Sequence, residues 1–168
     1  MTKTNKSTQE VLRIAGKLKE VVTLYDSTGK VIHKFINPLM LEFKPKDFIQ
    51  IIVGASILAI PVGFTQEVWD LSSTLPDLNI LLFFLVSICF ISIFVYYNYY
   101  RSEHFKNHKI EFLKRVFSTY FLSFLVVGLL LTMIGKAPWT SDLALALKVC
   151  TLVTFPASMS AAVADMVK

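Results

Sequence analysis

The sequence predicts an all-α membrane protein with four transmembrane helices and a small cytoplasmic N-terminal region that contains a β-hairpin. Apolar residues make up 54% of the 168 residues and charged residues only 17%. The mean hydropathy is +0.58. Soluble domains are about 45–50% apolar and about 25% charged. This composition excludes an ordinary soluble domain and leaves no room for a large catalytic one.

Residues 1–47 form the first predicted unit, and the transmembrane domain follows at residues 48–168. Apolar side chains recur at helical spacing over residues 9–20, which predicts a short amphipathic helix. Two runs rich in β-branched and aromatic residues then lie on either side of Gly29. They predict a β-hairpin in which Gly29 takes the left-handed conformation of the turn.

Four hydrophobic stretches follow, and each is long enough to cross the hydrocarbon core, which takes about 20 residues. Short polar breaks separate them, and the connection between the second and the third is basic. The four predicted spans cover residues 48–71, 79–100, 116–134 and 142–163.

The basic residues predict the orientation of these spans, because an excess of Lys and Arg marks the cytoplasmic side. Residues 1–47 hold nine of the 17 basic residues, and the connection at residues 101–115 holds five. The connection after the first span holds none. We therefore expect a multi-pass protein of the inner or plasma membrane with both termini in the cytoplasm.

Aromatic residues at the ends of the spans predict the same orientation. Tyr99 and Tyr100 lie at the expected inner end of the second span, whereas Trp69 and Trp139 lie at expected outer ends. Such rings anchor a helix at the membrane interface, because one side contacts hydrocarbon and the other contacts head groups.

The first candidate site is the segment from Pro61 to Trp69, which contains Gly63, Thr65 and Glu67. Proline inside a membrane helix leaves a backbone carbonyl without its usual donor, and glycine beside it lets the helix bend. One interpretation is a kinked helix whose acidic end meets water. The other is a cation or proton site in which Glu67 attracts the ion and Thr65 helps to bind it.

The second candidate site lies in the last span, where Thr154, Pro156 and Ser158 precede Asp165. Hydroxyl and small residues follow one another at steps of three and four along this helix. Small residues at this spacing let helices pack closely, so one interpretation is a tight helix contact. The other is a polar pathway lined by the hydroxyls.

The two proline segments, IPVGFTQEVWD and FPASMSAAVAD, resemble each other in sequence. In the predicted topology they cross the membrane in opposite directions, as an inverted pair of broken helices does. Either the similarity arises by chance or the two prolines flank a shared site.

The third candidate is a weak metal site in the basic connection, where His104, His108 and Glu111 share one helix face. The surrounding lysines favour a solvated basic helix near anionic lipid instead. Phosphate-binding glycine loops, catalytic triads and paired-cysteine motifs are all missing from the sequence. We therefore expect neither enzymatic activity nor a cofactor, and no nucleic-acid partner.

The chain resembles a prokaryotic family of integral membrane proteins of unknown function. Two motifs carry the resemblance, PxxxTxExW from Pro61 to Trp69 and PASxSAA from Pro156 to Ala162. The family pattern often has glycine in place of Ser160 and a basic residue near Asp165. The resemblance implies a polytopic membrane protein and supplies no activity.

From these observations we expect an oligomeric ion channel or transporter for a cation or proton. Four short spans leave little room for a pathway within one chain, so a homo-oligomer is expected. The alternative is a membrane scaffold or sensor that binds a partner protein or anionic lipid through its cytoplasmic region.

Overall fold

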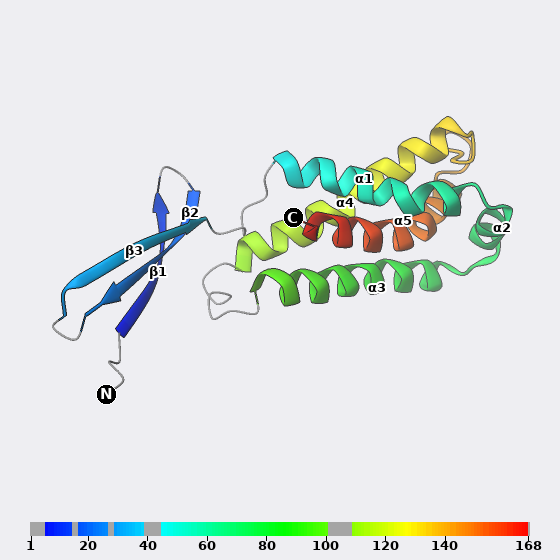
Figure 1. Cartoon of the computed structure of the whole chain (residues 1–168). Helices are drawn as coiled ribbons and strands as arrows, with labels where there is room; N and C mark the ends of the chain where they lie inside the picture. Colours follow the sequence, from blue (N-terminus) through cyan, green and yellow to red (C-terminus); the bar gives the residue numbers. More distant parts are fainter. Residues whose placement is uncertain (1–5, 15–16, 27–28, 39–44, 101–108, 168) are drawn as a thin grey trace. The chain divides into compact units, whose positions relative to one another are not determined.

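A computed structural model describes residues 6–14, 17–26, 29–38, 45–100 and 109–167 of the chain (Figure 1). The chain divides into two compact units, Met1–Glu42 and Phe43–Lys168.

The N-terminal unit is a three-stranded antiparallel sheet in the order β1, β2, β3. Gly29 connects β2 to β3 with a φ of 78°, so the predicted hairpin and the left-handed glycine are both confirmed. The Gly29 amide donates to the carbonyl of Asp26 at 2.9 Å and closes the turn. The strands are β1 (Lys6–Ile14), β2 (Lys17–Tyr25) and β3 (Val31–Pro38).

The amphipathic helix predicted over residues 9–20 is wrong, because this segment contributes to β1 and β2. Val11 pairs with Glu20 and Glu10 pairs with Val21 in an antiparallel register. An isolated helix of this length is marginal in water. In the sheet, in contrast, the backbone N–H and C=O groups of these residues form hydrogen bonds with those of the paired strand.

The described part of the membrane unit contains five α-helices, of which four are long and apolar enough to cross a membrane (Figure 1). The protein is therefore a multi-pass integral membrane protein, and the prediction of four transmembrane helices is confirmed. The helices are α1 (Pro45–Gly63), α2 (Gln66–Thr74), α3 (Asp77–Val95), α4 (Lys109–Met133) and α5 (Leu143–Met166).

Two predicted span boundaries differ from those of the helices. The first span was expected to continue to residue 71, but α1 ends at Gly63 and the short helix α2 follows it. The third span was expected to begin at residue 116, but α4 begins at Lys109. A hydropathy pattern shows where the apolar residues end, whereas the end of a helix depends on where its backbone hydrogen bonds are satisfied, so the two boundaries need not coincide.

Helix α5 lies at the centre of the bundle and contacts α1, α2, α3 and α4. Helix α3 is peripheral, and its only buried residues are Ser87, Ile91 and Val95. We refer to the end of the bundle that holds α2 as the α2 end. The starts of α1 and α4 and the end of α5 lie together at the opposite end, as an ion cluster between them shows.

Candidate functional site

Three charged side chains meet inside the bundle at the end opposite α2. Arg115 of α4 donates two hydrogen bonds to Asp165 Oδ2 of α5, from Nε at 2.9 Å and from Nη2 at 2.6 Å. The same Nη2 lies 3.3 Å from Asp47 Oδ2 of α1. We call these three residues the ion cluster.

The ion cluster is removed from solvent. The Arg115 side chain is 0% exposed, and those of Asp47 and Asp165 are 1% exposed. Burial of a charge is costly unless it is paired and hydrogen-bonded. Asp47 also lies in the first turn of α1, where the helix dipole favours a negative charge. Asp165 lies in the last turn of α5, where the helix dipole disfavours a negative charge, and its contact with Arg115 stabilises that charge.

Buried hydroxyl groups continue from the ion cluster along two helices. Thr119 and Ser123 follow Arg115 at steps of four residues on α4, and Ser158 and Thr154 precede Asp165 on α5. At about 1.5 Å per residue, these rows extend about 12 Å along α4 and about 16 Å along α5. Each hydroxyl donates to a carbonyl of its own helix, at distances of 2.9, 2.8, 3.0 and 2.7 Å. Each hydroxyl oxygen therefore keeps acceptor capacity.

Beyond these hydroxyl rows the core becomes apolar. The residues buried there belong to one hydrophobic cluster, and we call four of them the apolar plug: Val127, Leu131, Val149 and Val153. The polar rows therefore cover about half of a hydrocarbon core that is about 30 Å thick.

The first predicted site, from Pro61 to Trp69, lies at the α2 end, away from the ion cluster. Thr65 Oγ1 donates to the carbonyl of Val62 at 2.7 Å, and Trp69 Nε1 donates to the carbonyl of Gly63 at 3.0 Å. Helix C-terminal carbonyls lack intrahelical donors. Thr65 and Trp69 therefore satisfy the end of α1, a role that the sequence did not indicate.

Glu67 is exposed in the first turn of α2. A carboxylate is favoured at this position by the helix dipole. Its surroundings match the interpretation of an acidic helix end that meets water, and Glu67 is not brought together with Thr154 or Ser158.

Neither proline breaks its helix. Pro61 lies inside α1 and Pro156 inside α5, and both helices continue past them. The inverted pair of broken helices is therefore not formed. Helix α1 instead ends at Gly63, and Thr65 then adopts an extended conformation as the N-cap residue of α2.

Trp69 and Trp139 lie at the same end of the bundle, as expected for two anchors on one side. Lys136 Nζ lies 3.9 Å from the centre of the Trp69 ring. Trp139 Nε1 donates to Thr132 Oγ1 at 2.7 Å. Tyr99 and Tyr100 belong to a π-helical turn, Tyr96–Tyr100, but their side chains lie outside the described part of the chain.

The weak metal candidate finds no support in the described residues. His104 and His108 lie outside them, and Glu111 pairs with Lys114 at 3.4 Å. Across residues 6–14, 17–26, 29–38, 45–100 and 109–167, no group of three His, Cys, Asp or Glu residues could hold a metal ion.

Arg115 and Asp47 of the ion cluster are not among the candidate residues predicted from the sequence. Each lies directly before a predicted span, so Arg115 was counted with the basic connection and Asp47 with the N-terminal region. One signal was present, because Arg115, Thr119 and Ser123 form a polar row at helical spacing.

A comparison with family profiles decides the relationship of this chain to known proteins. The profile of an integral membrane protein family of unknown function, DUF2391, matches residues 37–167. The chain belongs to the DUF2391 family. No curated protein and no solved structure shows a significant match.

The two motifs of this DUF2391 protein have different structural roles. The first, from Pro61 to Trp69, completes the end of α1 and starts α2. The second, from Pro156 to Ala162, lies on α5, and its buried members pack inside the bundle. The family assigns the chain to the membrane and supplies no activity.

Proposed function

We propose that this DUF2391 protein transports protons or small cations and that the ion cluster is its binding site. The observation that carries the proposal is the burial of two carboxylates and one guanidinium at 2.6–3.3 Å, inside a membrane bundle. Ionisable groups in a membrane interior are costly and usually mark a pathway or a partner. We propose no enzymatic activity for this protein.

The contacts suggest how such a site would work. A proton or cation bound at Asp165 would weaken its attraction to Arg115, which connects α4 to α5 and, through Asp47, to α1. These helices would then be free to separate at this end. The acceptor oxygens of Thr119, Ser123, Thr154 and Ser158 provide the next polar groups for the ion. In this proposal, passage of the ion requires the apolar plug to open.

This proposal gives a smaller role in ion binding to Glu67, Thr65 and the carbonyls near Pro61 and Gly63. An exposed carboxylate at the expected outer surface raises the local concentration of cations, an effect that salt screens. We also propose a homo-oligomer, for which α3, the least buried of the four spans, offers an exposed apolar face.

The test is ion flux into liposomes that contain the purified full-length protein. We expect Asp165→Asn to reduce flux at least about tenfold, which corresponds to about 1.4 kcal/mol. The matched control is Asp142→Asn, which changes an exposed carboxylate at the other end of α5 and retains its role as an N-cap residue. We expect Glu67→Gln to reduce flux by about twofold at low salt and less at high salt.

A thermal melt of each variant in detergent shows whether it is folded, and Asp47→Asn replaces Asp165→Asn if the latter is not. Absence of flux for protons and for all common cations with folded wild-type protein would refute the proposal. Equal flux for wild type, Asp165→Asn and Asp47→Asn would refute the assignment of the site.

A second candidate function is that of a scaffold or sensor, which the N-terminal sheet favours. Large apolar side chains are exposed on this unit, and a single three-stranded sheet cannot bury them by itself. Deletion of residues 1–43 should then abolish binding of a partner protein or anionic lipid and leave permeability unchanged. The exposed residues are Leu12, Val31, Ile32, Phe35 and Ile36.

A further inference from the structure

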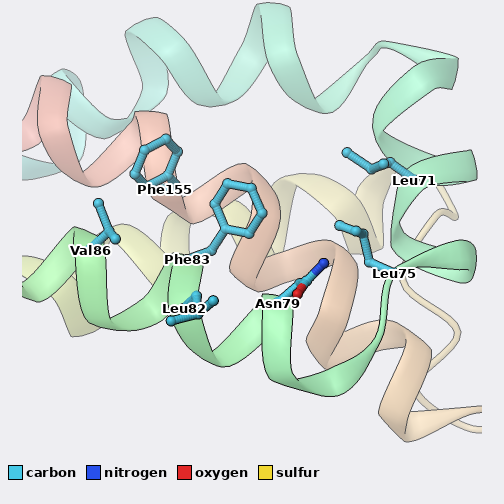
Figure 2. Close-up of a pocket in the computed structure, with 7 residues that line it drawn as sticks. All are labelled: Leu71, Leu75, Asn79, Leu82, Phe83, Val86 and Phe155. Carbon is cyan, nitrogen blue, oxygen red and sulfur yellow. The ribbon is translucent and has the colours of Figure 1, made fainter.

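A groove of about 570 Å³ lies near the α2 end of the bundle, between α2, α3 and α5 (Figure 2). Its volume falls within the range of about 300–1,000 Å³ that is typical of ligand pockets. Most of its lining is apolar: Leu71 and Leu75 at α2, Leu82, Phe83 and Val86 on α3, and Phe155 on α5.

Charged groups lie at one rim of this groove. Lys148 of α5 donates to the carbonyl of Leu75, a lining residue, at 3.1 Å. Its ammonium also lies 2.7 Å from Asp77 Oδ1, at the start of α3. The Asp77 side chain is 89% exposed, whereas that of Lys148 is 22% exposed. The rim therefore carries a salt bridge whose ammonium and carboxylate each keep capacity for a further hydrogen bond.

Asn79 is the polar residue of the groove lining. Its amide lies in the groove near Leu75 (Figure 2), and it makes no side-chain hydrogen bond to another described residue. An amide can donate two hydrogen bonds and accept two. Asn79 thus offers a donor to a ligand at the place where the charged rim gives way to the apolar lining.

We propose that this groove binds one phospholipid from the leaflet at the α2 end. The phosphate lies at Lys148, a headgroup amine at Asp77, an ester carbonyl at the Asn79 amide, and one acyl chain along the apolar lining. The order of groups along α3 matches the order within such a lipid. Asn79 and Val86 are about 10 Å apart along the helix at about 1.5 Å per residue.

Charge complementarity favours a phospholipid over a second copy of the chain. A zwitterionic headgroup pairs with both Lys148 and Asp77, whereas α3 of another subunit, the helix proposed for the homo-oligomer, has no charged residue after Asp77. A lipid tail also adapts to the irregular wall formed by Phe83 and Phe155, which pack edge to face at 5.3 Å.

The test uses full-length protein purified in detergent, with bound lipid counted by native mass spectrometry after addition of phosphatidylethanolamine. Leu82→Trp fills the groove, and Leu81→Trp is the matched control. Both leucines are 51% exposed on α3, but only Leu82 lines the groove. We expect Leu82→Trp to reduce retained lipid about fivefold or more, through lost packing along the acyl chain. Leu81→Trp should retain as much lipid as wild type.

A photo-crosslinking residue at position 82 identifies the occupant directly. An adduct with the mass of one phospholipid supports the proposal. A crosslink to a second chain, or equal lipid retention by Leu82→Trp and wild type, overturns it in favour of a subunit contact or of lipid bound without preference for the groove.

The headgroup assignment has its own variant, Asp77→Asn. Wild-type protein should retain phosphatidylethanolamine in preference to phosphatidylglycerol, and this preference should fall severalfold in the variant, because the amine loses its carboxylate partner. An unchanged preference, or none in the wild type, overturns the assignment of the amine to Asp77. Neither result depends on ion transport.

Discussion

Arg115 illustrates how a single side chain connects several helices in this protein. Its guanidinium has donors in a fixed planar arrangement, so one side chain can bind two carboxylates from different directions. In the bundle these carboxylates come from α1 and α5, while Arg115 itself belongs to α4. A lysine at the same position could not provide this geometry.

At the residue scale we therefore expect Arg115→Gln to lower the free energy of unfolding by about 3–5 kcal/mol, because it leaves buried carboxylates without their cation. The adjacent variant Lys114→Gln should change it by less than about 1 kcal/mol, since an exposed ion pair contributes little. The Lys114 side chain is 63% exposed. Equilibrium unfolding in mixed micelles measures both, and equal effects would contradict the assigned role of Arg115.

At the element scale, the most extensive helix contact is that between α1 and α5. A Cβ atom added at Gly54 of α1 would lie 2.9 Å from the Ala161 Cα and 3.0 Å from the Ser160 carbonyl oxygen, and it would overlap the side chain of Ala164. Small residues on both helices thus bring the two backbones together. These distances agree with a tight helix contact, which is one of the two interpretations of the small residues in the last span.

We expect Gly54→Ala to destabilise the bundle by about 1–3 kcal/mol through overpacking. Gly128→Ala is the matched control, because its added Cβ would meet only the Trp139 ring at 3.8 Å, an ordinary contact. Thermal unfolding of both variants in one detergent tests this difference. Adding Ala164→Gly to Gly54→Ala should restore part of the lost stability. A Gly54→Ala protein that is as stable as wild type would contradict the close contact between α1 and α5.

At the scale of the whole molecule, the two compact units predict separate folding. The membrane unit contains all buried members of the hydrophobic core cluster, and the N-terminal sheet contributes none. A chain that begins at residue 43 should therefore keep its helical circular dichroism and melt within about 4 °C of the full-length protein, which corresponds to less than about 1 kcal/mol. A much lower melting temperature would show that the sheet supports the bundle.

The hydrophobic stretches predicted the membrane environment and the four spans, and the β-branched and aromatic runs on either side of Gly29 predicted the hairpin. These features follow from local composition and spacing, which a linear pattern records. The helix expected at residues 9–20 failed because residues 9–14 form β1 and pair with residues 17–22 of β2, and this pairing rather than the apolar spacing decides between helix and strand.

The ion cluster is the feature that only the tertiary structure decided. Asp47 and Arg115 are 68 residues apart, and Arg115 and Asp165 are 50 residues apart. A pattern along the chain cannot show that these residues meet, because their contact depends on how three helices pack. For the same reason, the candidate residues predicted from the sequence did not include Asp47 and Arg115, which the packing of α1, α4 and α5 brings together with Asp165 at the end of the bundle opposite α2.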